Sequence, residues 1–257
     1  MMISFFLTPL ITLLLFFSLA SLISALIKRA DFADVIWSMG FLLLSWISYA
    51  LSPFKSSYQF ILTSIISLWA VRLFIHIGSR NRKKAEDFRY QEMQKTWKRF
   101  FFLHLFFKVF MLQALILLIT AFPILWILFH PFTGNWLPFY LALPIWIFGF
   151  IFEAVSDFQL LSFQQKKTGK LLTSGLWAYS RHPNYFGELL QWWAIWIFAL
   201  AFPLGWITFL GPLLLTTLII FVSGVKPLEK KMKDHPDFAS YAKSTPCLIP
   251  SFFTKKT

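Results

Sequence analysis

Long apolar runs alternate along the chain with shorter polar segments. A helix needs roughly 20 apolar residues to cross the hydrocarbon core of a bilayer. The pattern predicts membrane helices at about residues 3–27, 33–51, 58–78, 100–129, 137–156, 187–203 and 206–225. We therefore expect an all-α, polytopic membrane protein with seven transmembrane helices, the fourth of them kinked at Pro123.

Positive charge is distributed unevenly between the predicted loops. If the N-terminus is outside, nearly every Lys and Arg falls on the inner side, in residues 28–32, 79–99, 157–186 and 226–257. The positive-inside rule then predicts an outside N-terminus and a cytoplasmic C-terminus. A signal peptide is the alternative for the first run, but that run lacks a basic start. The inner loops are long and polar, so we expect the functional site to face the cytoplasm.

The composition narrows the classes of function. Hydrophobic residues make up 58% of the chain and aromatic residues 20%, which excludes an ordinary soluble domain. The net charge of +13 sits in the loops, where topology and contact with membrane lipids explain it, so we expect no nucleic-acid partner. One Cys and five His without paired ligand spacing predict no metal site. Without repeats or a break in composition, residues 1–257 are interpreted as a single domain.

Polar side chains gather at one depth, near the inner ends of the predicted helices. Charged groups inside a bilayer are costly, so they mark a candidate site. Three pairs have the i, i+4 spacing that places both members on one helix face: Arg72 with His76, Glu153 with Asp157, and Asn184 with Glu188, the last extended by Gln191. For Asp31, His76 and Lys108 we prefer the simpler interpretation of a helix end that reaches the headgroups.

Residues 175–193 combine a polar start with an apolar helix. Gly175 is a flexible point, and Pro183 suits a first helical turn. Donors gather at this helix N-terminus, which is a natural anion site: Arg181, His182, Asn184 and Tyr185. Glu188 lies one turn deeper and accepts hydrogen bonds. A nucleotide cofactor has both an anionic part and donor groups, so it fits a site with donors at the helix N-terminus and an acceptor one turn deeper. Trp192 and Trp196 share a face, for which an interfacial belt is the preferred interpretation.

The segment 80–99 is charged and helix-prone, and a solvated or headgroup-facing surface is its simpler interpretation. Within it, EDFRY at residues 86–90 places an acid, an Arg and a Tyr side by side. Such a group can both donate and accept hydrogen bonds.

Several motifs resemble one enzyme superfamily. SDFQLLSF at 156–163, SGLWAYSRHPNYFGELLQWW at 174–193 and SGVKPLEKKMKDHPDFASYAKSTPCLIPSFF at 223–253 are similar to the C-terminal domain of steroid 5α-reductases. They resemble still more closely a bacterial subgroup known as a conserved domain of unknown function, as do DFADVIWSMGF at 31–41 and LWAVRLFIHIGSRN at 68–81 with EDFRY. Isoprenylcysteine carboxyl methyltransferases and sterol C14 reductases carry similar Arg-His-Pro-Asn-Tyr runs. The resemblance implies a bacterial inner membrane.

The resemblance also implies a cofactor site. In the reductases seven membrane helices enclose NADPH, which delivers hydride to an enone double bond. By position, Asp157, Asn184 and Glu188 match cofactor contacts, and Arg181, His182 and Tyr185 fall in the same motif.

The chain departs from the reductase pattern at three places. The Gln-Glu-Leu-Pro segment with the catalytic Glu is missing, and LWAVRLFIH at 68–76 lacks the catalytic Tyr. VSGVKPLEKK at 222–231 replaces a His-rich cofactor segment and leaves Lys226 or Glu229 as substitutes.

Three functions follow. The first is an NADPH-dependent oxidoreductase that reduces an activated C=C bond of a lipid-like enone, with Asp34 and Tyr90, supported by Asp87 and Arg72, as candidates for the acid. The second is an S-adenosylmethionine-dependent methyltransferase with a lipid or prenyl acceptor, although Glu229 alone stands where that family has paired acids. The third is a non-catalytic lipid-binding or structural membrane protein. The substrate and the oligomeric state stay open.

Overall fold

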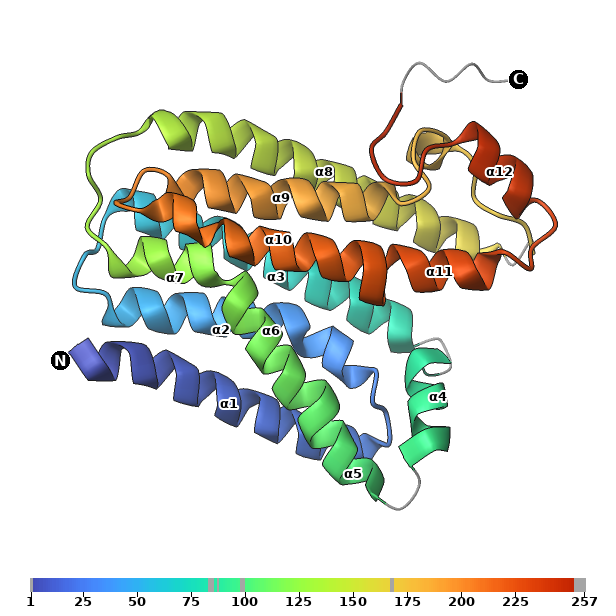
Figure 1. Cartoon of the computed structure of the whole chain (residues 1–257), viewed down its shortest axis with the longest axis horizontal. Helices are drawn as coiled ribbons and strands as arrows, with labels where there is room; N and C mark the ends of the chain where they lie inside the picture. The colour runs from blue at the N-terminus through green and yellow to red at the C-terminus, as the bar shows by residue number, and fades with distance from the viewer. Residues whose placement is uncertain (1, 83–85, 87, 98–99, 167–168, 252–257) are drawn as a thin grey trace. The chain divides into compact units, whose positions relative to one another are not determined.

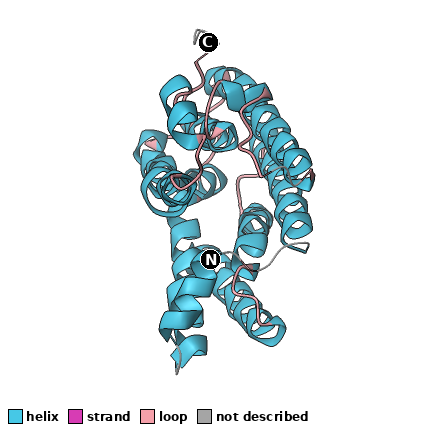
Figure 2. Ribbon diagram, turned by 90° about the vertical axis from the view of Figure 1, so that its right-hand side faces the viewer, coloured by secondary structure: helices cyan, strands magenta, loops and turns pink. Residues whose placement is uncertain are grey.

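The computed structural model describes residues 2–82, 86, 88–97, 100–166 and 169–251. All regular structure among these residues is helical (Figure 2). Six helical stretches are long and apolar enough to cross a membrane. They are Leu7–Ile27, Phe32–Leu51, Ser57–Arg82, Phe101–Thr120, Leu137–Gln165 and Gly205–Met232. The prediction of an all-α, multi-pass membrane protein is confirmed.

The predicted span at 187–203 corresponds to α9 (Pro183–Ala199), which has 17 residues. At 1.5 Å per residue such a helix is about 25 Å long, slightly less than a hydrocarbon core of about 30 Å. Seven spans and the orientation in the membrane therefore stay predictions. In contrast, α8 (Leu137–Gln165) runs well past the predicted end at 156, because the following SDFQLLSFQQ contains no helix breaker.

The chain divides into two compact units, Met1–Thr133 and Gly134–Thr257. Figure 1 draws the elements of both. The first unit contains α1 (Met2–Ile27), α2 (Phe32–Leu51), α3 (Ser57–Arg82), α4 (Phe88–Trp97), α5 (Phe101–His104), the π-helix η2 (Leu105–Met111), α6 (Leu112–Thr120) and α7 (Phe122–Phe129).

In the first unit, α2 packs against α1, α3, α6 and α7. Its Gly40 permits the close approach of two neighbours, since an added Cβ would lie 2.6 Å from Leu117 and 3.1 Å from Phe17. The helix that begins at Phe101 breaks at Ala121, and Pro123 stands in the first turn of α7. The fourth predicted helix is thus interrupted at Ala121, two residues before the Pro123 at which we expected a kink.

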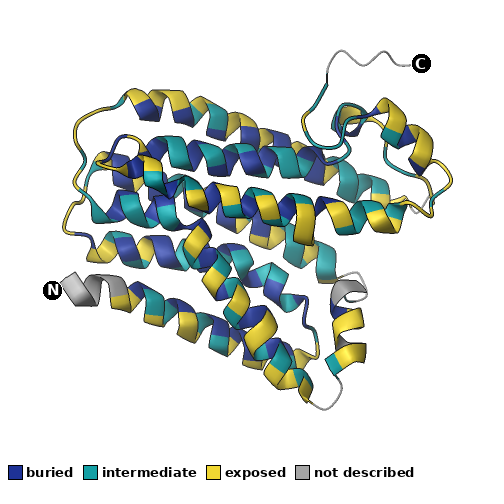
Figure 3. Cartoon of the chain, viewed as in Figure 1, coloured by how far each residue is buried: buried dark blue, intermediate teal, exposed yellow. Residues whose placement is uncertain are grey.

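The second unit contains α8, the 3-10 helix η3 (Gly175–Ala178), α9, the 3-10 helix η4 (Gly205–Phe209), α10 (Leu210–Thr217), the π-helix η5 (Leu218–Ser223), α11 (Val225–Met232) and α12 (Phe238–Ser244). Buried positions line α9, and exposed positions cover much of α12 (Figure 3). The paired helices α8 and α9 form the core of this unit.

Two glycines let α8 and α9 approach closely. A Cβ added to Gly187 would lie 2.6 Å from both the carbonyl oxygen of Gly149 and the amide nitrogen of Glu153. A Cβ on Gly149 would lie 2.7 Å from the carbonyl oxygen of Gly187. In a bilayer, helices associate through such close packing and interhelical hydrogen bonds rather than through a hydrophobic effect. The glycine crossing therefore fixes which side chains of α8 and α9 face each other.

Candidate functional site

Two pairs of carboxylate and amide side chains connect α8 to α9. Nε2 of Gln191 donates to Oε2 of Glu153 at 2.7 Å, and Nδ2 of Asn184 donates to Oδ1 of Asp157 at 3.2 Å. Glu153, Asp157 and Gln191 are buried, and Asn184 is half-buried. The i, i+4 spacing on α8 and the i, i+7 spacing on α9 therefore do bring the predicted polar residues together.

Both amide side chains donate hydrogen bonds through their nitrogen, but among the described residues their oxygens accept none. Oδ1 of Asn184 and Oε1 of Gln191 are buried and accept no hydrogen bond from any described residue. A buried acceptor left without a donor costs about 1–3 kcal/mol. Such an atom calls for an explanation, and a bound ligand that donates hydrogen bonds is one.

Glu188 lies on α9 between these two pairs, four residues after Asn184 and three before Gln191. Its side chain is half-buried. Acceptor groups therefore follow one face of α9 from its first turn to its third.

Arg181 joins three segments of the second unit. Its Nε donates to Oε1 of Glu229 at 2.7 Å, while Nη1 donates to the carbonyl oxygens of Ala242 at 3.0 Å and Thr245 at 2.6 Å. This predicted anion-binding residue thus ties the start of α9 to α11 and to the end of α12. The sequence identified Glu229 only as a substitute for another family's residue, yet it is the charge partner of Arg181.

His182 is 2% exposed and stands directly before α9. Its ring stacks on Tyr185 with centroids 5.6 Å apart, and Nε2 lies 3.3 Å from Oε1 of Glu229. Burial lowers the pKa of His182, and Glu229 offsets part of that shift. A neutral imidazole at neutral pH follows. Tyr185 in turn packs against Gly224, where an added Cβ would lie 3.1 Å from the Tyr185 ring.

In the first unit, the hydroxyl of Tyr90 donates to Oδ1 of Asp34 at 2.8 Å. Tyr90 is 6% exposed, although it lies on the short polar helix α4. The backbone nitrogen of Ala30 donates to Glu86, which fixes the same segment near the start of α2. Two of the four candidates for the acid, Asp34 and Tyr90, are thereby brought together.

The other two candidates differ in what the structure describes. Arg72 lies within α3, half-buried and one turn before His76. Asp87 lies outside the described residues.

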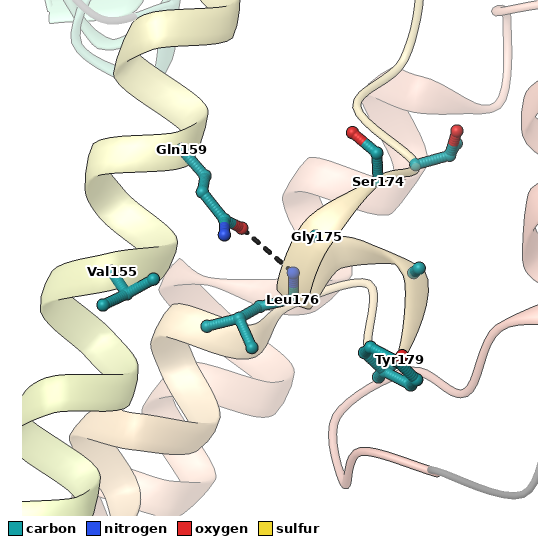
Figure 4. Close-up of a pocket in the computed structure, with 8 residues that line it drawn as sticks. Val155, Gln159, Ser174, Gly175, Leu176 and Tyr179 are labelled. Carbon is teal, nitrogen blue, oxygen red and sulfur yellow. Dashed lines mark hydrogen bonds between the residues drawn. The ribbon is translucent and has the colours of Figure 1, made fainter.

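A pocket of about 440 Å³ opens between α8 and the segment before α9 (Figure 4). Its eight lining residues are uncharged, and Gln159, Thr173, Ser174 and Tyr179 supply polar atoms. Oε1 of Gln159 accepts the backbone N–H of Leu176 at 3.0 Å. Gly175 has a φ of +65°, and a Cβ there would lie 2.6 Å from the Gln159 amide, so glycine shapes this wall. No charged residue marks this pocket in the sequence, since Gln159 is neutral.

These features define the class: a multi-pass, all-α membrane protein with polar residues grouped at helix ends within each of its units. The chain belongs to the family described as "Protein of unknown function (DUF1295)", whose sequence model matches residues 20–245. No curated protein and no solved structure matches the chain. The family match includes Asp34 and Tyr90 in the first unit and residues 153–229 in the second.

Proposed function

We propose that this protein is a membrane oxidoreductase that uses NADPH to reduce an activated carbon–carbon double bond of a lipid-like enone. The observation that carries the proposal is the pair of buried acceptors on α9, Oδ1 of Asn184 and Oε1 of Gln191, which meet no donor among the described residues. The resemblance to steroid 5α-reductases assigns Asp157, Asn184 and Glu188 to the cofactor independently of that observation.

The residues present fit a nicotinamide nucleotide. Its ribose hydroxyls and carboxamide N–H groups are donors, which match the acceptors of Asn184, Glu188 and Gln191. The pocket between α8 and the segment before α9 has a size typical of small-molecule sites and a mostly apolar, uncharged lining with a few polar groups. When bound, NADPH supplies a hydride to the β-carbon of the enone.

The chain must also stabilise the negative charge that develops on the carbonyl oxygen. Tyr90 is the group we assign to this task, with Asp34 as the residue that positions its hydroxyl. The phenolic O–H donates to the Asp34 carboxylate. A phenol held in this way can donate a hydrogen bond or a proton to a developing oxyanion, which lowers the energy of an enolate.

A single titration distinguishes the candidate functions. Detergent-purified protein is heated with increasing NADPH or S-adenosylmethionine, since a ligand that binds the folded state raises the melting temperature. We expect protection by NADPH. Protection by S-adenosylmethionine alone would identify a methyltransferase, and protection by neither would favour the non-catalytic lipid-binding function.

Two variants test the residues. Glu188→Ala and Asn184→Ala should each weaken NADPH binding well over tenfold. Gln113→Ala is the matched control, because Oε1 of Gln113 is also buried without a hydrogen bond in the described structure but lies on α6 in the first unit. Unchanged NADPH affinity in the first two variants would refute the assignment.

A further inference from the structure

Three metal-ligating side chains from separate segments meet beside Arg181. Nε2 of His182 lies 3.3 Å from Oε1 of Glu229, and Sγ of Cys247 lies 3.5 Å from the same oxygen. All ligating atoms of the three residues lie within 4.8 Å of one another. His182 precedes α9, Glu229 lies on α11, and Cys247 follows α12, so the group lies wholly within the second unit.

These separations resemble the edges of a zinc coordination shell. A tetrahedral zinc ion with bonds of about 2.0–2.3 Å holds its nitrogen, oxygen and sulfur ligands about 3.3–3.6 Å apart. The two distances to Glu229 already have this length. Only the separation between His182 and Cys247 has to decrease, by about 1.2 Å at most, for a tetrahedral shell.

The backbone holds Cys247 next to His182. The N–H of Arg181 donates to the carbonyl oxygen of Pro246 at 2.9 Å, and the hydroxyl of Ser180 donates to that of Leu248 at 2.7 Å. The acceptors lie on either side of Cys247, and the donors are the two residues directly before His182. Two of the three ligands are thus positioned without any contribution from a metal.

The third ligand, Glu229, is oriented by Arg181 through the bond from Nε at 2.7 Å. Donors that bind a ligating carboxylate are common around metal sites, where they fix the ligand's orientation. Charge is also balanced, because a thiolate and a carboxylate together neutralise a divalent ion. The positive charge of Arg181 then remains. Its Nη1 donates hydrogen bonds to the carbonyl oxygens of Ala242 and Thr245.

We propose that His182, Glu229 and Cys247 form a binding site for a divalent cation of the zinc type, with the fourth position open to water. Borderline-soft ions prefer such a mixture of sulfur, nitrogen and oxygen ligands. On binding, the Cys247 thiol gives its proton to solvent, a sulfur–metal bond forms, and no redox change occurs. The site joins the segment after α12 to the start of α9 and the middle of α11, and the proposal does not rest on the proposed reductase activity.

Cobalt(II) is the probe, because a cobalt–thiolate bond gives a charge-transfer absorption band. Cys247 is the one cysteine of the chain, so any such band in the purified, metal-stripped protein reports this residue. We expect about one cobalt per chain, displaced by zinc, given the three protein ligands of the site. Absence of the band at saturating cobalt would overturn the proposal.

Variants separate a three-ligand site from a lone thiol. Cys247→Ser should abolish the band, whereas His182→Gln and Glu229→Gln should each weaken cobalt binding at least tenfold. His235→Gln is the matched control, since His235 lies in the same unit and binds the carbonyl oxygen of Gly169 instead. Cobalt affinity equal to wild type in both His182→Gln and Glu229→Gln would reduce the site to a lone thiol and refute it. The proposal is supported if His235→Gln binds cobalt as tightly as wild type does. The melting temperatures of all variants must also show that they are folded.

Discussion

Gly187→Ala probes the crossing of α8 and α9 on which the site depends. The new methyl group would lie 2.6 Å from two backbone atoms of α8, whereas ordinary contacts begin at 3.4 Å. Backbone atoms cannot turn away, so the helices must separate by about 0.8 Å, a form of overpacking that typically costs about 1–3 kcal/mol.

The same separation acts on the polar pairs. It would lengthen the hydrogen bond between Asn184 and Asp157 from 3.2 Å to about 4 Å, beyond bonding distance. Interhelical hydrogen bonds in membranes contribute on average about 0.6 kcal/mol each. Replacing a helical Gly by Ala returns up to about 1 kcal/mol of helix propensity. The net loss of stability should therefore be about 0.6–2.6 kcal/mol, with a parallel loss of NADPH binding.

Gly78→Ala is the matched control, because a Cβ at Gly78 in α3 meets only Val35 at 3.7 Å. This variant should be as stable as wild type or slightly more stable. Denaturation in mixed detergent micelles, followed by circular dichroism, measures both free energies of unfolding. Equal stability of Gly187→Ala and Gly78→Ala would refute the argument that the crossing requires glycine.

Three further predictions concern single residues. Tyr90→Phe should lose about 1.5–3 kcal/mol of local stability, because it removes a hydrogen bond to the Asp34 carboxylate; hydrogen exchange at residues 88–97 measures this loss, and unchanged protection would contradict it. Burial lowers the pKa of His182 below its ordinary 6.5, so at low pH the unfolded chain takes up a proton that the folded chain does not. The free energy of unfolding should therefore fall as the pH drops below about 6.5. Melting temperatures at about pH 7.5 and about pH 5.5 should differ accordingly, and His182→Gln should reduce that difference. Gly175→Ala should cost about 1–2 kcal/mol from its φ of +65° plus the clash with Gln159. Gly169→Ala, with a φ of +69° and no described atom within 4 Å, should show the strain alone. Equal melting temperatures for these two variants would rule out the clash.

The membrane helices were predictable because apolar runs of sufficient length have few other uses. Their ends were less accurate: α8 continues beyond 156 because polar residues such as Asp157 and Gln159 tolerate a helix once α9 and the pocket segment cover them. The short α9 shows the opposite error, since hydropathy extends across residues 200–203, where the backbone turns before Leu204 with its φ of +54°.

The sites were predictable where one helix carried the pattern. Spacing alone indicated that Glu153 and Asp157 share a face, as do Asn184, Glu188 and Gln191. Contacts between residues of different segments were harder to predict. Depth in the membrane suggested that Asp34 and Tyr90 lie close, but no spacing connects Glu229 or Cys247 with Arg181, because tertiary folding alone joins the segments around 181, 229 and 247.

The bonds between residues 179–181 and 246–251 also have a consequence for biosynthesis. Ser180 leaves the ribosome 68 residues before its partner Leu248, a delay of several seconds at about 5–20 residues per second. During that interval the Arg-His-Pro turn is already made but lacks the carbonyl groups that later hold it. A chain that ends directly before Pro246 keeps Glu229, Ala242 and Thr245, the partners of the Arg181 guanidinium, but lacks the acceptors of the Arg181 backbone N–H and of the Ser180 hydroxyl.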